Sequence, residues 1–254
     1  MKSVVVIPAR LASSRFPRKV LYELNGKSTL EHVYRRSAIA LGDDNVWIAT
    51  CDAEIKQSAS KYCPRVVMTK DTHIDCNDRV VEAAQHIAAD IVVIVQGDEP
   101  VLDPRAVHMA IEPFKKNPAC LATNLIKKID PNQEDPRSYN VVKAVVNTKN
   151  QILYMSREPI PTPQRAPGLE RTYYRQLGIM GFRADFLQLF GSLPRGPLEQ
   201  AEGVEMNRVI ENGYPLEYGI IESNCLAIDV PEDVPGIERA LRADQYTSRY
   251  TPQS

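Results

Sequence analysis

Four cations fall within ten residues of the N-terminal segment, at Arg10, Arg15, Arg18 and Lys19. The segment follows a short apolar run, and small residues are interleaved with the cations. Guanidinium groups bind phosphate oxygens through paired hydrogen bonds, and a lysine adds a mobile point charge. A basic segment is more often a solvated surface loop, but its position directly after an expected strand favours a phosphate-binding loop.

Two acidic residues stand where magnesium ligands would be expected. Asp98 follows the most apolar segment of the chain, in the run QGDEP, and Asp229 lies in the run LAIDVPED. Mg²⁺ prefers oxygen ligands and usually also binds substrate phosphates, so an acid near a phosphate-binding loop is a candidate ligand. The structural alternatives are a turn former for Asp98 and a helix N-cap for Asp229.

Other common nucleotide- and metal-binding patterns are absent from the sequence. Residues 26–28 resemble the end of a Walker A loop, but Leu21 stands where that motif needs a glycine, and there is no GxGxxG. The 4 histidines lack HxxxH spacing, and the 5 cysteines are scattered without a CxxC pair. We therefore expect no zinc site, and we expect reduced thiols in a cytoplasmic protein.

Composition excludes several classes of protein. The 254 residues include 31 Lys+Arg and 32 Asp+Glu, which gives a formal net charge of -1. This balance argues against a protein that coats a nucleic acid polymer or an anionic membrane, because both need a broad basic face. No apolar run is long enough to span a membrane, and the first run is too short for a signal-peptide core.

Strands and helices that could position the two loops alternate four times in the first 115 residues. The predicted strands are 3–7, 45–49, 66–68 and 91–95, and the predicted helices are 30–41, 53–62, 78–88 and a segment from 103. This order predicts an α/β fold with a mostly parallel central sheet and helices on both faces, which makes three layers. Ligands in such sheets bind at the carboxyl ends of the strands, where the two loops begin.

The second half of the chain is less regular and predicts a mixed sheet. Its expected strands are 141–146, 152–155, 177–183, 216–221 and 226–228, and its expected helices are 199–212 and 232–241, with a proline-rich loop at 159–169. Because there is neither an internal repeat nor a long linker, we expect one domain spanning 1–254.

These motifs together resemble the bacterial CMP-Kdo synthetases, the cytidylyltransferases that activate 3-deoxy-manno-octulosonate (Kdo). The match consists of segments 7–19, 95–100 and 229–233 with shorter matches between them, in register from about residue 3 to about residue 240. The resemblance implies a nucleotidyltransferase fold and Mg²⁺-dependent cytidylyl transfer from CTP to the anomeric hydroxyl of a 2-keto-3-deoxy sugar acid, with release of pyrophosphate. It also implies a nucleotide-binding half (about 1–125) and a sugar-binding half (about 126–254). The second half would carry a mixed-sheet dimerisation insertion that forms a homodimer, and the pathway would be lipopolysaccharide biosynthesis.

The resemblance also implies roles for individual residues. Arg10, Arg15 and Lys19 would hold the triphosphate, Arg15 and Lys19 would stabilise the leaving pyrophosphate, and Asp98 and Asp229 would hold Mg²⁺. The other nucleotide-binding positions are Pro8, Ala9, Ser14, Asn77, Arg79 and Gln96. The sugar-binding positions are Gln96, Arg157, Gln176, Glu199, Glu202 and Glu205.

The chain departs from the family pattern at its base and sugar positions. Segment 75–79 reads DCNDR where the family has Ser-Gly-Thr-Glu/Asp-Arg, which leaves strict preference for CTP open, although Asn77 still offers a donor and an acceptor. Gln176 and Met180 replace a histidine and a tyrosine, and Arg18 replaces a glycine. Altered polar contacts favour a different sugar acid or base over ordinary drift. A catalytically silent nucleotide-binding protein is the remaining alternative, which the retained cations and acids disfavour.

Overall fold

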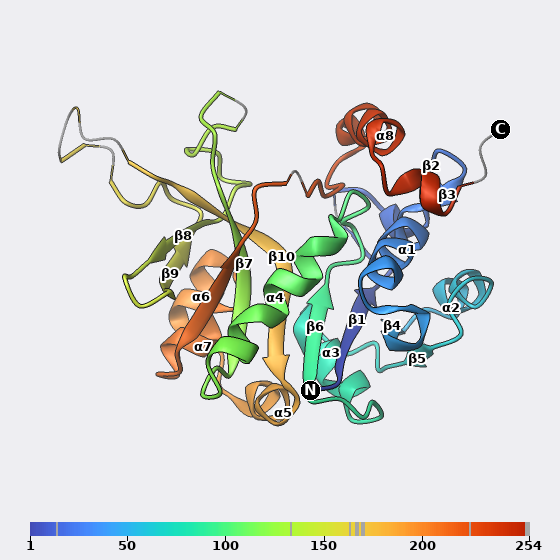
Figure 1. Cartoon of the computed structure of the whole chain (residues 1–254), viewed down its shortest axis with the longest axis horizontal. Helices are drawn as coiled ribbons and strands as arrows, with labels where there is room; N and C mark the ends of the chain where they lie inside the picture. Colours follow the sequence, from blue (N-terminus) through green and yellow to red (C-terminus); the bar gives the residue numbers. More distant parts are fainter. Residues whose placement is uncertain are drawn as a thin grey trace. The chain divides into compact units, whose positions relative to one another are not determined.

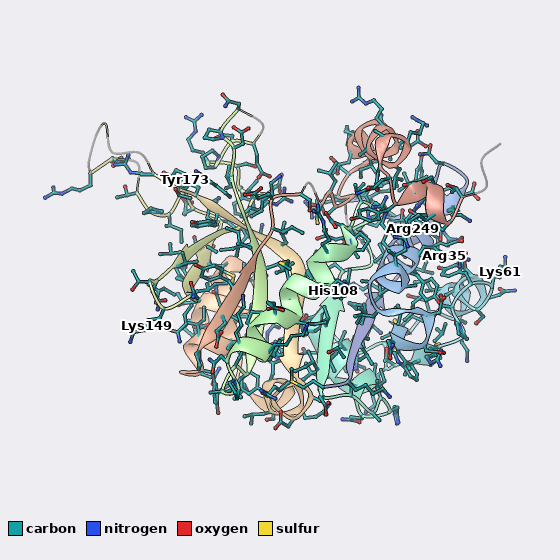
Figure 2. The ribbon with its side chains drawn as sticks, in the orientation of Figure 1. Arg35, Lys61, His108, Lys149, Tyr173 and Arg249 are labelled. Atoms are coloured by element: carbon teal, nitrogen blue, oxygen red, sulfur yellow. The ribbon has the colours of Figure 1, made fainter. Side chains whose placement is uncertain are left out.

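The computed structural model describes residues 1–251 except 14, 133, 163, 166, 167, 169, 170 and 224. The chain packs into two compact units: the first comprises Met1–His108 with Asn224–Ser254, and the second comprises Met109–Ser223. Charged side chains such as Lys61 and Lys149 project from the surface (Figure 2). Among the described residues, every helix is too short or too polar to cross a membrane.

A parallel four-stranded sheet forms the centre of the first unit (Figure 1). Its order is β5 (Val66–Met68), β4 (Val46–Thr50), β1 (Ser3–Ala9) and β6 (Ile91–Val95), and every neighbouring pair is parallel. All five residues of β6 and all but the first residue of β1 are buried, as covered parallel strands require. The predicted parallel sheet is therefore confirmed in this part of the chain.

The helices α1 (Thr29–Leu41), α2 (Ala53–Ala59) and α3 (Cys76–Ala84) connect these strands, and α4 (Pro104–Lys116) follows β6. The hydroxyl of Ser28 accepts a hydrogen bond from the Glu31 amide at 3.1 Å and caps α1, as the sequence predicted. Because β1 lies between β4 and β6, right-handed crossovers place α1 and α2 on one face and α3 on the other. The strand order reverses at β1 and β6, which makes their carboxyl ends the expected ligand crevice.

The C-terminal segment packs in the first unit against the hairpin of β2 (Glu23–Leu24) and β3 (Lys27–Ser28). It contains the short turn η3 (Pro231–Asp233), the helix α8 (Val234–Ala243) and the turn η4 (Thr247–Arg249). One apolar cluster joins these elements, and its buried members are Leu24, Val101, Ile228, Ile237 and Leu241. This cluster fixes the segment that carries Asp229.

The second unit is built on five strands with a mixed pattern of pairing. They are β7 (Ala122–Lys128), β8 (Lys143–Val146), β9 (Gln151–Ser156), β10 (Tyr174–Arg183) and β11 (Leu216–Ile220). Strand β11 runs parallel to β7, whereas the pairings β10–β7, β11–β9, β9–β8 and β8–β10 are antiparallel. Each strand thus has two partners within the unit and the pairing closes into a ring, which confirms the predicted mixed sheet. The helices α5 (Ala184–Ser192), α6 (Pro197–Glu202) and α7 (Asn207–Glu211) complete the unit.

Two local predictions are wrong. The single helix expected at 199–212 is two helices, because Gly203 takes a left-handed conformation (φ 60°) and ends α6. Residues 226–228 form no strand; instead the amide of Ile228 bonds the carbonyl of Asp98 at 2.8 Å. The elements β7, α5 and the β2–β3 hairpin were not predicted from the sequence. Positions 163, 166, 167 and 169 of the expected proline-rich loop lie outside the described residues.

Candidate functional site

The loop after β6 lies directly against the end of β1. A Cβ atom built on Gly97 would lie 2.8 Å from the carbonyl oxygen of Pro8, closer than real side chains approach a backbone. Glycine at position 97 therefore permits the contact that brings Asp98 to the end of β1. Pro8 and Ala9 are the last two residues of β1 and are both buried, while Gln96 is half-buried at the start of the second loop.

Lys19, in the short turn η1 (Lys19–Leu21), joins the two candidate metal ligands. Its Nζ atom lies 2.5 Å from Oδ2 of Asp98 and 3.4 Å from Oδ1 of Asp229, and it donates to the carbonyl of Ile228 at 3.0 Å. Burial lowers the pKa of Lys19, but the two carboxylates outweigh burial and raise it, so the ammonium stays charged. Residues that are far apart in the sequence thus form one cluster of charge.

Arg15 adds a second cation to this cluster. Its guanidinium donates to Oδ1 of Asp229 at 2.8 Å, and both side chains remain partly exposed. The carboxylate of Asp233 accepts the amides of Asp229 and Val230 at 2.8 and 3.0 Å, which holds the turn. The backbone-capping contacts in this turn are therefore made by Asp233, and the Asp229 carboxylate faces the cations.

This donor set fits a magnesium ion. Two carboxylates already converge on a single positive group, the Lys19 ammonium, within 3.4 Å. Mg²⁺ is commonly held by one or two carboxylates, with water and substrate phosphates as its other ligands. The described residues contain no group of three or more His, Cys, Asp or Glu side chains that could hold a metal, so phosphate and water would complete the shell here.

The other residues predicted to bind the nucleotide lie on neighbouring loops. The Arg10 guanidinium is exposed and donates to the carbonyl of Ile74 at 3.2 Å, while Ser14 lies outside the described residues. Asn77 and Arg79 are buried on α3. The Arg79 guanidinium donates to Oγ1 of Thr69 at 2.6 Å, which ties α3 to the end of β5.

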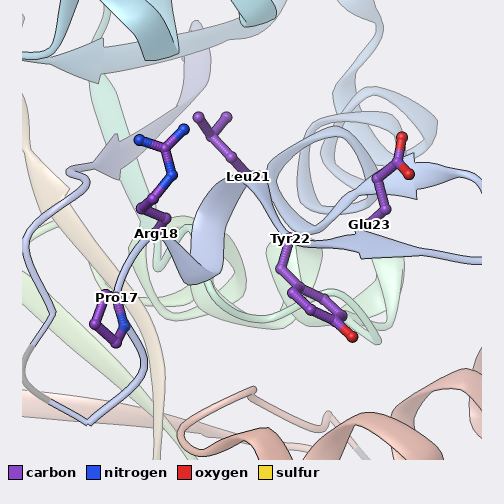
Figure 3. Close-up of a pocket in the computed structure, with 5 residues that line it drawn as sticks. All are labelled: Pro17, Arg18, Leu21, Tyr22 and Glu23. Atoms are coloured by element: carbon purple, nitrogen blue, oxygen red, sulfur yellow. The ribbon is translucent and has the colours of Figure 1, made fainter.

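Arg18 does not direct its charge at the acids of the cluster. Its backbone is left-handed (φ 62°), a region that favours glycine, which accounts for the glycine that the family pattern has there. Its guanidinium bonds both carboxylate oxygens of Glu54 on α2, one of them at 3.0 Å. Arg18 lines a pocket of about 600 Å³ together with Leu21 and Tyr22, which Figure 3 labels.

In the second unit, Glu202 organises the candidate sugar-binding arginine. Its carboxylate accepts hydrogen bonds from the Tyr154 hydroxyl (2.6 Å), the Ser156 hydroxyl (2.6 Å) and the Arg157 amide (2.8 Å). Burial raises the pKa of Glu202, but these hydrogen bonds outweigh it and lower the pKa, so the group is ionised. The Arg157 guanidinium bonds the carbonyls of Glu202 and Tyr139 at 2.8 and 3.1 Å and lies 5.0 Å from the exposed Tyr139 ring.

The other predicted sugar-binding acids have different surroundings. Glu199 is 1% exposed, and its carboxylate bonds Arg208 at 2.9 and 2.6 Å and Arg195 at 3.1 Å. Glu205 is half-buried between α6 and α7. Glu199 and Glu202 thus share α6 as the sequence predicted, whereas Glu205 lies beyond its end, and Glu199 belongs to a buried ion pair.

Two buried polar residues have roles that sequence reasoning missed. Lys143 is fully buried, and its Nζ atom donates to the carbonyls of Ser138 (3.0 Å), Val141 (2.6 Å) and Arg157. It thereby ties the start of β8 to the end of β9 beside Arg157. Asn124 on β7 accepts a hydrogen bond from Nε2 of Gln176 at 2.8 Å. The role of Lys143 could have been found from the sequence, because a lysine stands inside the apolar run 141–146. No comparable sequence pattern marks Asn124.

Known proteins are similar to this chain in sequence and in fold. A family model described as Cytidylyltransferase matches residues 4–222. A 3-deoxy-manno-octulosonate cytidylyltransferase from Solibacter usitatus is 39% identical over 245 residues, which is 95% of each chain. An 8-amino-3,8-dideoxy-manno-octulosonate cytidylyltransferase from Shewanella sp. is 36% identical over 251 residues, 96% of this chain and 100% of the other. The solved structure of a CMP:2-keto-3-deoxy-manno-octonic acid synthetase complexed with CTP is 33% identical, with a TM-score of 0.88 over 96% of this chain and 99% of that one.

Proposed function

Because the chain belongs to the cytidylyltransferase family, we propose that it transfers the cytidylyl group of CTP to the anomeric hydroxyl of a 2-keto-3-deoxy sugar acid, giving a CMP-sugar and pyrophosphate. Kdo is the sugar acid that the relatives support best. The observation that carries the proposal is the cluster of Lys19 and Arg15 with Asp98 and Asp229 at the carboxyl ends of β1 and β6. Such a cluster suits a triphosphate with its metal.

In this proposal Asp98 and Asp229 would hold Mg²⁺, which would supply charge neutralisation to the triphosphate. Arg15 and Lys19 exchange their carboxylate partners for phosphate oxygens when CTP binds, and Arg10 joins them. The exchange has a small electrostatic cost because each cation always faces an anion. The side chains that balance the acids in the free protein thus become the groups that bind the triphosphate.

The anomeric oxygen forms a bond to the α-phosphorus while the bond from that phosphorus to the bridging oxygen of pyrophosphate breaks. The hydroxyl proton leaves to water, and the charge that develops on pyrophosphate is stabilised by Arg15 and Lys19. Catalysis of this kind depends on positioning and charge neutralisation more than on a strong base. The cluster supplies both cations and carboxylates for that purpose.

For the sugar, we propose that Arg157 binds the carboxylate and that Gln176 binds a hydroxyl group, while a sugar contact from Gln96 stays a prediction. The contacts of Arg157 with Glu202 and Tyr139 support this role, because they hold the guanidinium in place. Glu202 acts through Arg157, and Glu199 acts through its buried pair with Arg208. Contact of Glu205 with the sugar stays a prediction, as do nucleotide contacts from Pro8, Ala9, Ser14, Asn77, Arg79 and Gln96.

We further propose a cytoplasmic homodimer whose chains each form one folding domain and whose product enters lipopolysaccharide biosynthesis. The dimer contact would be the mixed-sheet insertion of the second half. Large exposed apolar side chains in the second unit support an interface there, and they include Leu153, Leu189, Leu198 and Ile220. The remaining support is membership of the family.

A second candidate substrate is an amino sugar acid, since an 8-amino-3,8-dideoxy-manno-octulosonate cytidylyltransferase is nearly as similar to the chain as the Kdo enzymes. The altered segment 75–79 keeps another base as a further alternative. Pyrophosphate release distinguishes these readings when each of the four nucleoside triphosphates is combined with Mg²⁺ and a panel of 2-keto-3-deoxy acids. We expect release with CTP and Kdo.

The variant Asp98→Asn tests the proposed metal ligand in the same assay. We expect it to lose most of its activity, whereas the control Asp44→Asn, which alters an exposed acid paired with Arg65, should keep it. Faster release with another nucleotide would make the base assignment wrong. No release from any pair would favour a silent nucleotide-binding protein.

A further inference from the structure

The buried side chain of Asn124 has a fixed orientation. Its Nδ2 atom faces the carbonyl oxygens of Leu125 (2.9 Å), Leu177 (2.9 Å) and Ile179 (3.4 Å). Carbonyl oxygens only accept hydrogen bonds, so the atom that faces them must be the amide nitrogen. The pairing of β10 with β7 shifts register between Gln176 and Met180, and Asn124 satisfies carbonyls of that irregular stretch. A reversed Asn124 amide would turn an acceptor toward three acceptors.

The orientation of Asn124 in turn fixes that of Gln176. The Oδ1 atom of Asn124 can only accept, and Nε2 of Gln176 donates to it at 2.8 Å. The Oε1 atom of Gln176 therefore points away from Asn124. No side chain that the structure describes donates to this oxygen, and it is not among the described buried oxygens that lack a partner. Gln176 thus presents an accessible acceptor, and one N–H of its Nε2 atom also remains, since the bond to Asn124 uses only one of the two.

This acceptor lies beside the candidate sugar-binding arginine in the register of the sheet. Lys143 on β8 is the register partner of two residues, Arg175 on β10 and Ser156 on β9. Gln176 is the next residue of β10 and Arg157 directly follows the last residue of β9, so the two lie one on each side of the start of β8. The second unit therefore carries a guanidinium and a fixed carbonyl acceptor at the same end of β8.

We infer that Asn124 and Gln176 make the sugar site prefer a hydrogen-bond donor at one substituent of the substrate, so that a hydroxyl or an ammonium group facing the Gln176 oxygen is a better substrate group than one that cannot donate. The inference rests on the proposed function and narrows its substrate class. An ammonium group forms the stronger, charge-assisted hydrogen bond to a carbonyl oxygen. An amino-substituted 2-keto-3-deoxy acid is therefore a substrate as good as the hydroxyl compound or better. A reversed Gln176 amide would place a donor there and repel the ammonium group.

The test measures kcat/KM for Kdo analogues in which one hydroxyl at a time is replaced by hydrogen, fluorine or an amino group. The positions tried include position 8. At one of them, kcat/KM should be about tenfold lower for the hydrogen and fluorine analogues than for Kdo, as expected for the loss of one hydrogen bond, while the amino analogue should show no decrease. In Gln176→Met this difference should disappear. Gln151→Met is the matched control, because Gln151 forms an amide pair with Asn147 at 3.0 Å elsewhere in the same unit, and it should keep the difference.

The variant Asn124→Leu tests the positioning role. It frees the Gln176 amide to rotate, so the preference for donors should shrink, and thermal unfolding reports whether the variant is folded. If Asn124→Leu is not folded, Gln176→Met alone tests whether the preference for donors depends on this pair of amides. Equal rates for all analogues in an active wild-type enzyme would overturn the inference and leave the proposed function intact. No turnover of any sugar acid with any nucleotide would overturn both.

Discussion

The Nζ atom of Lys19 lies 2.5 Å from the Oδ2 atom of Asp98, which joins the basic loop after β1 to the acidic loop after β6. Neither group is fully exposed, with 13% and 25% of their side chains accessible. The ammonium therefore occupies the space between the carboxylates that a divalent cation would need. In the proposed function, Lys19 and Mg²⁺ would therefore compete for these acids until phosphate oxygens offer the lysine another partner.

This competition predicts opposite effects of Lys19→Met on metal binding and on catalysis. Without the ammonium, Asp98 and Asp229 repel each other, so Mg²⁺ should bind the nucleotide-free variant more tightly than the wild type in calorimetry. The rate should fall by about 10²–10³-fold, as for loss of a group that stabilises developing charge. Lys27→Met, which removes a lysine paired with Glu31 at 3.0 Å, should change neither. Unchanged Mg²⁺ affinity in Lys19→Met would contradict the competition.

Gly97→Ala should damage both stability and activity. The added methyl group would lie 2.8 Å from the Pro8 carbonyl, and neither backbone can yield without moving β1 or Asp98. We expect a loss of about 1–3 kcal/mol in the free energy of unfolding, as for an overpacked site. Urea titration measures it. Gly236→Ala is the control, because a Cβ there meets nothing within 4 Å in α8, and it should gain about 0.5–1 kcal/mol. Equal stability of the two variants would argue against the close approach.

Arg36 anchors the C-terminal segment. It is 1% exposed, donates to the Leu102 carbonyl at 2.9 Å and the Thr247 hydroxyl at 2.8 Å, and pairs with Asp244. Arg36→Met should lower the free energy of unfolding by about 3–5 kcal/mol, the usual result of breaking a buried ion pair. Hydrogen exchange should rise first in residues 228–250, which include Asp229. Arg35→Met alters the more exposed neighbour labelled in Figure 2 and should cost less than about 0.5 kcal/mol. Uniform exchange across the chain would refute the anchoring role.

His32 makes stability depend on pH. Its Nε2 atom donates to the Leu24 carbonyl at 2.8 Å, so Nδ1 accepts from the Tyr250 hydroxyl at 2.9 Å and the ring is neutral. Burial lowers the pKa of His32 below the ordinary 6.5 and outweighs the hydrogen bond to the Leu24 carbonyl, which raises it; the nearby Arg36 charge adds to the lowering, and Glu31 opposes it. The unfolded chain therefore binds the proton more readily. The contribution of neutral His32 to the free energy of unfolding is present above about pH 6.5. It is lost as the pH falls from there toward the lower pKa that His32 has in the folded protein.

Urea midpoints at pH 7.5 and pH 5.5 check this dependence. The decrease on acidification should be smaller in His32→Gln than in the wild type, because the variant lacks the titrating ring. His108→Gln, at an exposed histidine of α4, should behave as the wild type does. The same decrease in all three proteins would show that other groups cause the pH dependence.

The sequence was most informative where burial and chain order determine structure locally. The strands β1 and β6 are continuous β-branched runs, and Ser28 is a hydroxyl directly before a helical pattern, so each could be predicted from its own residues. The strand β7 was missed because Ala122–Lys128 ends in two lysines and breaks the apolar pattern. Gly203 ends α6 through a backbone conformation that the helical spacing around it does not reveal.

The site could be predicted from its residue types but not its contacts. Lys19 and Asp229 are 210 positions apart, and only the fold brings them within 3.4 Å. Lys143 and Asn124 bond backbone carbonyls, which every residue has, so no partner residue marks them in the sequence. The single-domain organisation and the homodimer stay predictions.

Identification of the product is the most direct test of the central claim. Phosphorus NMR of the wild-type protein with CTP, Mg²⁺ and Kdo should show one phosphodiester signal of a CMP-sugar for each pyrophosphate formed, and neither should form without the sugar. CTP that stays intact, or that is hydrolysed to CMP at the same rate without the sugar, would contradict cytidylyl transfer to a sugar acid.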